Sequence, residues 1–512
     1  MAMLSLCKIL SRQSPLSRTL TSQFWRTTAS HASSSPKGDS HPAQSDSDLK
    51  PFSSIPGLTG LSTVGNTLRT LRNNHQLHQI HERQAKQFGG LWRATVGSWN
   101  LLFIANPRGV RDVIRCEGKR PERPGIPQWT EYYSSTNKPL GIIMSQGKEW
   151  QRMRRTLDKP ILRPALFRRH VDSLSEVSSD FVDKLDTLRD VNGDVSNIQS
   201  ELFKWSLESA CTVLINKRLG CLKSQPPTGV QEFINATLYV FEYMSKRMLF
   251  PTPFLKLFYN KEWRTFERNF GILFKVAEEQ ITQGMEDTSL TEESFIGHIL
   301  SRDNLTLKEV YSNVTELMFA SVDTTSNTAH ALLWILARNP SIQQQCYQEM
   351  NEVLPDWKRP SYSDLDKLKY TTGLIKETLR LFPPAYVTTR TFSEDGDVCG
   401  YKVPAGVRIL LSFYPMGRDP NLFPDPEVVK PERWIRHGET SHSEPDPFSS
   451  IPFGIGLRSC IGRRIAMAEA QLLCTEIVRR YCLTSMTSEF NLTTRLTLSA
   501  TAPIQLTLTP RT

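Results

Sequence analysis

The most informative stretch of this chain is Phe453-Gly454-Ile455-Gly456-Leu457-Arg458-Ser459-Cys460-Ile461-Gly462. Its three glycines permit positive φ and close backbone approach, which a flat cofactor lying against the turn requires. After the cysteine, apolar residues recur at helical spacing, at Ile461, Ile465, Ala468, Leu472 and Leu473. Cys460 is therefore predicted at the start of a helix, where backbone N–H groups and the helix dipole stabilise a thiolate.

A single anionic sulfur in such a turn suits the axial position of a haem iron. Phe453 supplies an apolar wall, and Arg458 is placed to reach a haem propionate. The alternative is an inert, buried cysteine in a glycine turn. The spacing F-G-x-G-x-R-x-C-x-G resembles the haem-binding loop of the cytochrome P-450 family, the haem-thiolate monooxygenases. The resemblance implies haem b held by Cys460, with Phe453 and Gly454 in the binding loop.

The fold class that this resemblance implies is mainly α with small β-sheets. It is a single-domain cytochrome P-450 fold, with the haem between a long central helix and the cysteine loop. The composition agrees with one large globular domain, because 39% of the 512 residues are hydrophobic and 22% are charged. The nine cysteines form no C-x-x-C pair, which favours reduced thiols in an intracellular compartment and no zinc site.

The amino-terminal segment is basic, rich in serine and threonine, and free of acids. Residues 1–38 contain Lys8, Arg12, Arg18, Arg26 and Lys37. This composition is typical of a mitochondrial presequence, and the alternative is a disordered basic tail. No run of about 18 apolar residues follows, so no transmembrane anchor is predicted. We assign residues 1–38 to the presequence, 39–54 to a linker and 55–512 to the haem-thiolate domain.

Two further motifs supply candidate propionate ligands. Trp150 and Arg154 are four residues apart in a predicted helix, so they share a face and can reach one propionate together. They resemble the propionate-binding helix of the family. Arg390, in a predicted strand, resembles the family arginine of the second propionate. A helix surface pair and an exposed strand arginine are the alternatives.

The longest predicted helix begins at the capping box Thr306-x-x-Glu309 and runs to Arg338, before Asn339-Pro340. Its middle carries Asp323 and Thr324, polar residues that are costly in an apolar helix unless they have partners. Threonine hydroxyls also compete for backbone carbonyls and can open a helix locally. This turn resembles the oxygen-activation motif of the family, which implies that Asp323 and Thr324 relay protons. A locally opened helix would form a notch where dioxygen fits. Ser321 departs from the motif, where glycine is usual, and its side chain can narrow this notch or add a hydrogen-bond donor.

An E-x-x-R pair precedes the cysteine loop. Glu377 and Arg380 lie three residues apart on a predicted helix, and Pro431-Glu432-Arg433-Trp434 follows. By itself the pair indicates only a surface ion pair. Together with the later segment it resembles the buried Glu–Arg–Arg cluster of the family. We therefore interpret Glu377, Arg380 and Arg433 as structural residues behind the haem.

Other segments have simpler interpretations. A hairpin is predicted from Leu91 to Ile104 with a turn near Gly97-Ser98, and a terminal hairpin is predicted from residues 496–498 and 504–508. Residues 165–280 are predicted to be mainly helical. The apolar stretch 248–255 has two interpretations of equal weight, a bilayer contact and a loop buried on the core.

The resemblance also implies the reaction and its partners. It implies insertion of one oxygen atom from O₂ into an apolar C–H bond, while the other atom leaves as water. The sequence contains no flavin or nicotinamide fingerprint, so electrons must come from another protein. The presequence indicates a mitochondrial ferredoxin and its reductase, at the matrix face of the inner membrane. Lys376, Arg463 and Arg464 resemble ferredoxin-docking positions, although Thr372 and Met467 depart from the pattern.

Three functions remain open at this point. The first is a mitochondrial monooxygenase acting on a sterol, steroid or secosteroid, nearest to the vitamin D 24-hydroxylase and sterol 27-hydroxylase type. The second is a haem-thiolate isomerase or lyase that needs no external electrons. The third is a non-catalytic haem-binding sensor. No basic–aromatic module for nucleic acid is visible.

Overall fold

The structure is a computed structural model that describes residues 49–58, 62–162, 164–286, 294–301, 304–435 and 445–511. These residues belong to one compact unit, Leu49–Thr512. The predicted presequence, 1–38, and residues 39–48 of the predicted linker lie outside the described residues. For residues 49–54 the predicted linker is wrong. Lys50–Pro51 forms strand β1, which pairs with Tyr401 and Lys402, so the fold begins before Ile55.

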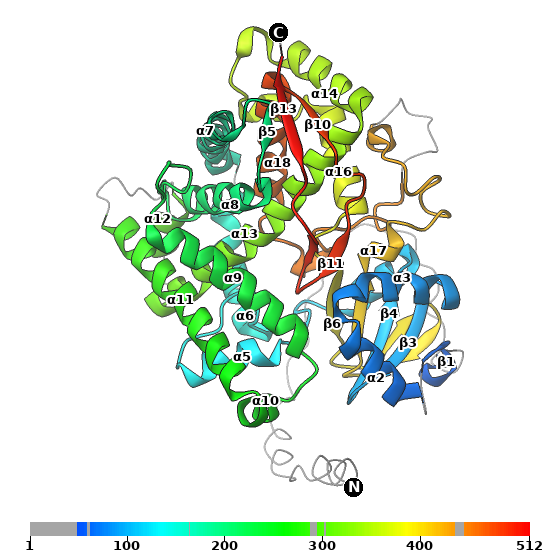
Figure 1. Ribbon diagram of the computed structural model, residues 1–512. Coiled ribbons are helices and arrows are strands. Elements are labelled where there is room, and N and C mark those ends of the chain that lie inside the picture. The colour runs from blue at the N-terminus through cyan, green and yellow to red at the C-terminus, as the bar shows by residue number, and fades with distance from the viewer. Residues whose placement is uncertain are drawn as a thin grey trace, which may run out of the picture. The chain divides into compact units, whose positions relative to one another are not determined.

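Helices make up most of the described chain (Figure 1). Their bounds are α2 Ser62–Arg72, α3 Leu77–Phe88, α4 Pro107–Cys116, α5 Pro127–Ser135, α6 Gly147–Leu162, α7 Pro164–Leu188, α8 Ile198–Leu214, α9 Thr228–Arg247, α10 Thr252–Phe258, α11 Asn260–Met285, α12 Phe295–Leu300, α13 Leu307–Arg338, α14 Pro340–Val353, α15 Tyr362–Leu365, α16 Lys369–Leu381, α17 Phe413–Met416 and α18 Arg463–Arg480. The predicted fold class, mainly α with small β-sheets, is confirmed.

The largest sheet has five strands in the order β2-β3-β4-β9-β6, and Figure 1 shows it beside α2 and α3. The strands are β2 Gly57–Leu58, β3 Leu91–Val96, β4 Trp99–Ile104, β6 Val387–Thr391 and β9 Arg408–Ser412. Strands β3 and β4 form the predicted hairpin, and Gly97 in its turn has a φ of 59°. This sheet carries the 387–391 strand, which lies near the site described below.

Three smaller sheets complete the strands. They are β1-β8-β7, with β7 Gly396–Val398 and β8 Tyr401–Val403; β10-β13-β5, with β5 Asp194–Val195, β10 Tyr481–Ser485 and β13 Leu506–Pro510; and β11-β12, with β11 Leu492–Thr494 and β12 Leu498–Ala500. The predicted terminal hairpin is therefore wrong. Strand β12 pairs with β11, whereas β13 pairs with β10, because each strand finds its partner earlier in the chain.

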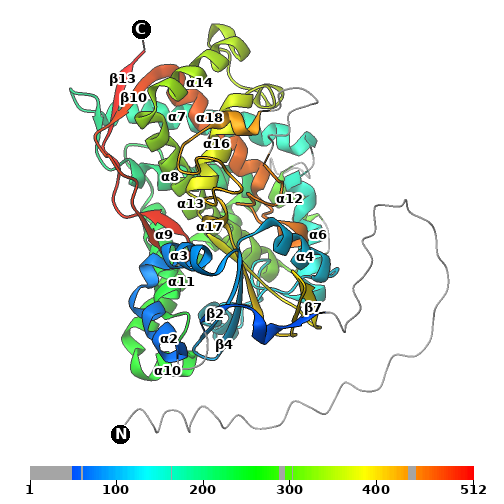
Figure 2. The same cartoon turned by 90° about the vertical axis from the view of Figure 1, so that its right-hand side faces the viewer.

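The long helix α13 passes through the middle of the helices, packed against α8, α11 and α18 (Figures 1 and 2). Its 32 residues span roughly 50 Å, and both arms of the predicted capping box, between Thr306 and Glu309, are present. Two apolar cores meet along it. Residues 310–322 contribute to one core and residues 329–337 to the other. The polar turn 323–328 lies at the junction between them.

Candidate active site

The cysteine loop is closed by its own backbone. Cys460 N donates to Phe453 O at 2.8 Å, and Gly454 and Gly456 have φ of 67° and 73°. Glycine is the residue that adopts these angles without strain. A Cβ on Gly456 would also clash with Glu117 Oε1. Gly454 is therefore required by the backbone conformation alone, and Gly456 is required by both the conformation and the lack of space for a Cβ. Helix α18 begins three residues after Cys460, as predicted.

The start of the helix stabilises the Cys460 thiolate less than the sequence predicts. Burial raises the pKa of the thiol above its ordinary value, while the backbone N–H groups of Gly462 and Arg463 and the charges of Arg154 and Arg123 act in the opposite direction. The start of helix α18 thus offsets only part of the desolvation. A stable thiolate at this position needs a cationic partner, and a coordinated metal ion deprotonates a thiol outright.

Cys460 opens onto a cavity of about 400 Å³. Its lining comes mainly from the cysteine loop, helices α6, α8, α13, α16 and α18, the segment that contains residues 142 and 143, and the region of strand β6. The lining includes Phe453, Gly454, Trp150, Leu317, Ala320, Ser321, Thr324 and Val387. Most of these side chains are apolar, so the cavity joins one thiol to an apolar space beside the polar turn of α13.

Three guanidinium groups line the same cavity, those of Arg123, Arg154 and Arg458. Arg154 Nη1 donates to Ser459 O at 2.7 Å, and its Nε lies 2.7 Å from Asp158 Oδ1. The Arg458 guanidinium lies 4.1 Å from the centre of the Trp150 ring, close enough for a cation–π interaction. The predicted pair Trp150 and Arg154 therefore lies beside Arg458.

Arg458 is held mainly by neutral acceptors. Its Nε donates to Pro121 O at 3.0 Å and its Nη2 to Ser145 O at 2.9 Å. Burial, together with the charge of Arg123, lowers its pKa to about 9. The guanidinium clusters with like charges, which leaves it suited to an anionic ligand.

Arg123 is a cavity cation that sequence reasoning missed. Burial lowers its pKa to about 10, and among the described residues no acceptor meets its buried Nε. Its Nη2 donates weakly to Thr388 Oγ1 at 3.3 Å and to Arg458 O at 3.4 Å. A signal was present in the sequence, because Arg123 closes the basic, proline-containing run Lys119-Arg120-Pro121-Glu122-Arg123.

Arg390 lies in strand β6, as predicted, but outside the cavity lining. Its buried guanidinium donates to Glu117 Oε2 at 2.7 Å and to Ile455 O at 3.1 Å, and Arg390 is not among the cavity-lining residues. The carboxylate of Glu117 draws it away from the cavity and ties it to the cysteine loop. A contact with a propionate stays a prediction for Arg390, whereas Arg123, Arg154 and Arg458 already face the cavity.

The polar turn of α13 divides its two candidate catalytic residues. Thr324 lines the cavity, and its Oγ1 donates to Ala320 O at 2.9 Å within a helix that is continuous through this turn. Asp323 is buried on another side of the helix and accepts a hydrogen bond from the Thr497 hydroxyl. Burial raises the pKa of Asp323, and Thr497 and Arg495 oppose that shift. The predicted notch is therefore not an open turn, and the two side chains diverge.

Ser321 lines the cavity where the family motif has glycine. Its hydroxyl donates to Met318 O at 2.9 Å, so its hydrogen is used inside the helix. The side chain narrows this part of the cavity, as expected.

Glu469 on α18 is a further lining residue that the sequence analysis did not single out. Thr325 Oγ1 lies 3.4 Å from its Oε2, and burial raises its pKa to about 8. The signal was an acid one residue after Ala468, on the predicted apolar stripe of the helix. A largely neutral carboxyl group therefore borders the cavity at neutral pH.

The predicted Glu–Arg–Arg cluster is assembled. Glu377 and Arg380 are fully buried and form a bidentate pair at 2.8 and 2.7 Å. Arg433 Nε lies 3.6 Å from Glu377 Oε2, and Trp434 Nε1 donates to Glu377 Oε1 at 2.9 Å. Arg380 also donates to the carbonyls of Gly417 and Pro426. The cluster ties α16 to the segment that precedes the cysteine loop.

The three candidate docking residues lie outside the cavity lining. Arg463 and Arg464 are exposed in the first turn of α18, and Lys376 is partly exposed on α16 with its Nζ 5.5 Å from the centre of the Trp434 ring. Their positions leave the docking role a prediction.

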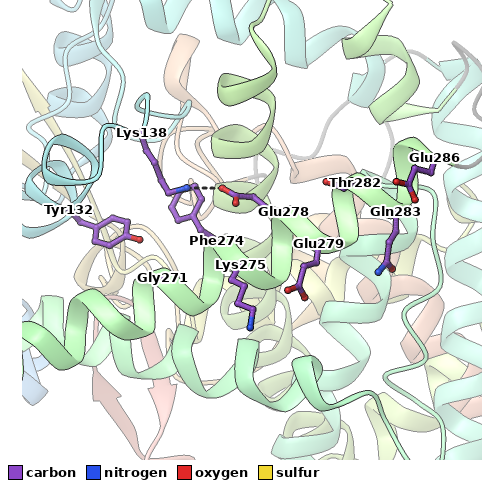
Figure 3. A pocket seen from close by; sticks show the side chains of 10 residues that line it. All are labelled: Tyr132, Lys138, Gly271, Phe274, Lys275, Glu278, Glu279, Thr282, Gln283 and Glu286. Atoms are coloured by element: carbon purple, nitrogen blue, oxygen red, sulfur yellow. Dashed lines mark hydrogen bonds and ion pairs between the residues drawn. The ribbon is translucent and has the colours of Figure 1, made fainter.

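A second hollow, of about 580 Å³, lies along α11 (Figure 3). A Lys138–Glu278 ion pair of 2.7 Å crosses it, and other charged side chains, among them Glu279 and Glu286, line it. It contains no thiol and none of the predicted site residues. We therefore place the candidate active site at the cavity of Cys460.

The Cys460 cavity fits a haem. It combines an axial thiol, apolar walls and a group of cations that includes the unpartnered Nε of Arg123. A haem held by a cysteine thiolate defines the class of haem-thiolate enzymes.

The chain belongs to the cytochrome P450 family. The family described as Cytochrome P450 matches residues 55–508. The protein is accordingly a P450 monooxygenase.

Its relatives include mitochondrial hydroxylases. It is 32% identical over 405 residues to the mitochondrial 1,25-dihydroxyvitamin D(3) 24-hydroxylase of Mus musculus. The aligned residues make up 79% of this chain and 78% of the relative. It is 34% identical over 441 residues to cytochrome P450 27C1 of Danio rerio, with 83% and 81% covered. It is 32% identical over 413 residues to the mitochondrial sterol 26-hydroxylase of Rattus norvegicus, with 77% and 76% covered. The resemblance to the mitochondrial branch is thereby confirmed.

Among the described residues, none of the helices is both long enough and apolar enough to cross a membrane.

Proposed function

We propose that this monooxygenase inserts one oxygen atom from O₂ into an apolar lipid, and that the lipid is a sterol, steroid or secosteroid. The observation that carries the proposal is the juxtaposition of Cys460 with an apolar cavity bordered by α13. The relatives named as vitamin D and sterol hydroxylases support the substrate class. Burial of apolar substrate surface in such a cavity contributes about 25 cal/mol of binding free energy for each Å² removed from water.

Haem b is the cofactor that these residues fit. Cys460 would ligate the iron, and Arg123, Arg154, Arg458 and Trp150 would hold the propionates, with Phe453 and Gly454 against the ring. When bound, the haem supplies oxygen activation, and thiolate ligation favours O–O cleavage as it does throughout this family. The Cys460 side chain is exposed and lies in the cavity lining, so its sulfur is accessible to a metal ion bound there.

The chain itself manages protons and substrate position. Thr324 Oγ1 is one of the α13 hydroxyls that line the cavity, with those of Ser321, Thr325 and Thr328, and we assign proton delivery to it. We assign to Asp323 the role of a proton reservoir on the side of α13 away from the cavity. There its carboxyl group accepts a hydrogen bond from the Thr497 hydroxyl, and Arg495 is a nearby charge. The apolar side chains of Leu317 and Val387 orient the substrate and exclude water. Glu377, Arg380 and Arg433 hold the segment before the loop in place.

Electrons come, in this proposal, from a mitochondrial ferredoxin and its reductase. Lys376, Arg463 and Arg464 are the docking candidates, because an acidic partner is attracted by cations near the cysteine loop. Five basic residues and no acids in residues 1–38 support import into mitochondria, with residues 39–48 as the remaining linker. We place the enzyme at the matrix face of the inner membrane.

The ligand assignment is tested by carbon monoxide binding. The reduced protein is expected to show the red-shifted Soret band of a thiolate adduct, and Cys460→Ser is expected to lose it. Cys482→Ser, at an exposed thiol far along the chain, is the matched control and should keep the band. A band that persists in Cys460→Ser would refute the assignment.

The electron source is tested by donor preference. Turnover of a sterol or secosteroid is expected to be faster with a mitochondrial ferredoxin than with the diflavin microsomal reductase. Arg463→Glu combined with Arg464→Glu should raise the apparent KM for ferredoxin, because it reverses the charge at the docking candidates. The opposite donor preference would contradict the compartment, and turnover without any reductant would favour an isomerase or lyase.

A further inference from the structure

The segment between α5 and α6 forms part of the cavity wall, and it has no regular secondary structure. Ile142 and Ile143 line the cavity next to Leu317 and Ala320 of α13. A turn that joins Ser145 N to Gly141 O at 2.9 Å shapes this segment. Residues in such a segment keep their place only if their backbone groups find partners.

Three successive amides of this segment donate to two side chains of α13. Gly141 N donates to Glu316 Oε1 at 3.2 Å, Ile142 N to Asn313 Oδ1 at 2.8 Å and Ile143 N to Glu316 Oε2 at 2.8 Å. Asn313 and Glu316 are three residues apart and so share a helix face. Both are fully buried. We call this arrangement the amide clamp.

The clamp is tight and has a further anchor. A Cβ on Gly141 would clash with the carboxyl group of Glu316, so only glycine allows this approach. Tyr133 Oη donates to Glu316 Oε1 at 3.0 Å, which ties the carboxylate to α5 as well. Leaving a buried amide without its acceptor costs about 1–3 kcal/mol, so the loss of Glu316 favours movement of the segment.

The clamp and the candidate catalytic turn are on one helix. Thr324 lies eight residues beyond Glu316 on α13, which is about 12 Å along the axis. A helix that is packed in two cores is stiff, whereas the 141–143 segment depends on the clamp. A change at Glu316 therefore moves Ile142 and Ile143 and leaves Thr324 in place.

We propose that Glu316 and Asn313 are positioning residues that set the depth of the cavity, by holding Ile142 and Ile143 against α13. The proposal rests on the proposed function in one respect, that ligands bind in this cavity beside the haem. It assigns substrate selectivity to two buried polar side chains that touch neither substrate nor cofactor.

The clamp also responds to pH. Burial raises the pKa of Glu316 to about 7, while the hydrogen bonds from Ile143, Tyr133 and Gly141 oppose that shift. Tyr133 is the titratable side chain that contacts it among the described residues, and burial keeps its pKa well above the ordinary value, so it stays a donor. A protonated Glu316 is a weaker acceptor than the carboxylate, and its O–H group must itself find an acceptor, which weakens the clamp.

The test uses the haem-loaded protein and two iron ligands of different size, imidazole and 4-phenylimidazole. Imidazole reports the iron alone, whereas the phenyl group extends into the cavity. Glu316→Gln is expected to change the ratio of the two dissociation constants by about fivefold to tenfold, with imidazole itself changed less than about twofold. Ser312→Ala is the matched control, because it changes a buried polar side chain next to Asn313 on the same helix and leaves all the amide bonds of the clamp. It should keep the wild-type ratio.

Two further readouts separate positioning from stability. Hydrogen exchange at residues 141–143 should accelerate about tenfold in Glu316→Gln, while that of α13 stays unchanged. The wild-type ratio of dissociation constants, with each constant calculated for the neutral ligand, should shift between pH 8 and pH 6, and that of Glu316→Gln should not. If Glu316→Gln fails to fold, Asn313→Ala tests the clamp at its other acceptor on α13, and Gly141→Ala tests it from the 141–143 segment.

The outcomes are distinguishable from those of the proposed function. A wild-type protein that gives no iron-ligand spectrum with imidazole would contradict the haem site, and exchange at residues 141–143 would still test the clamp. Wild-type ratios and wild-type exchange in the folded Glu316→Gln, Gly141→Ala and Asn313→Ala variants would overturn the positioning role.

Discussion

At the scale of single residues, Arg123 and Arg390 show how charge is shared around this cavity. Glu117 neutralises Arg390 at 2.7 Å, whereas Arg123 has carbonyl and hydroxyl partners at 3.3 Å or more and a buried Nε without one. An arginine whose donors are not satisfied by protein is the better ligand for a carboxylate, because it gains most from a charge-assisted hydrogen bond. The anionic end of the cofactor is therefore assigned first to Arg123, Arg154 and Arg458.

Arg123→Leu is expected to weaken haem retention. The substitution removes a cation from the cavity and leaves a propionate without a partner, so transfer of haem to apomyoglobin should be about tenfold faster, as for the loss of one charge-assisted hydrogen bond. The control is Arg120→Leu, at an exposed residue that pairs with Gln151. Equal rates for the wild type and both variants would show that Arg123 does not hold the cofactor.

At the scale of elements, the cavity depends on how α13 and α18 face each other. Both helices pack in the same core, and Glu469 of α18 meets Thr325 of α13 inside it. The contact is long, so it offsets little of the desolvation of the carboxylate. The protonated form is consequently the form that this helix pair accommodates.

This arrangement gives the stability a pH dependence of known sign. The native protein keeps a proton on Glu469 up to about pH 8, whereas the unfolded chain releases it near its ordinary pKa of about 4.3. The contribution is fully present below the unfolded pKa, and it declines by at most about 1.4 kcal/mol per pH unit until the folded pKa is reached.

Glu469→Gln is expected to flatten that decline, because glutamine resembles the protonated acid and cannot ionise. Urea unfolding of the haem-loaded protein at pH 6, 7 and 8 measures the effect, and the variant should gain on the wild type as pH rises. Glu489→Gln, at an exposed position, is the control. Parallel profiles for Glu469→Gln and the wild type would contradict a buried neutral carboxyl group.

At the scale of the whole molecule, one face carries exposed apolar side chains. Leu257 and Phe258 at the end of α10 are 73% and 65% exposed, and Leu68 on α2 is 55% exposed. Both views place α2 and α10 near the same end of the described chain (Figures 1 and 2). The stretch 248–255 is only partly exposed, because Leu255 is fully buried. The interpretation as a loop packed on the core therefore applies to Leu255, and a bilayer contact remains a candidate for the exposed end of α10.

Leu257→Glu combined with Phe258→Glu is expected to reduce binding to vesicles of neutral and anionic phospholipid by at least about tenfold. Burying each apolar side chain contributes about 1.5–3 kcal/mol, which two carboxylates remove. Vesicle co-sedimentation measures it, and Met486→Glu, an exposed residue between β10 and β11, is the control. Unchanged binding of the double variant would exclude α10 as the membrane contact.

The sequence by itself determined the features that depend on local spacing. The glycine turn before Cys460, the capping box and length of α13, the β3–β4 hairpin and the pairing of Glu377 with Arg380 follow from short-range patterns, whereas Arg433 was added to that pair only by the resemblance to the family. Backbone conformation, helix capping and the sharing of a helix face depend on residues within a few positions of one another, so they can be predicted from the local sequence.

Tertiary structure decided where side chains point and which distant strands pair. It brought Arg123 to the backbone of Arg458, 335 positions away, turned Asp323 towards Thr497, and paired β10 with β13 instead of forming the terminal hairpin. It also joined Gly141 and Ile143 to Glu316. These contacts depend on burial and competition among partners far apart in the chain, which no local pattern records.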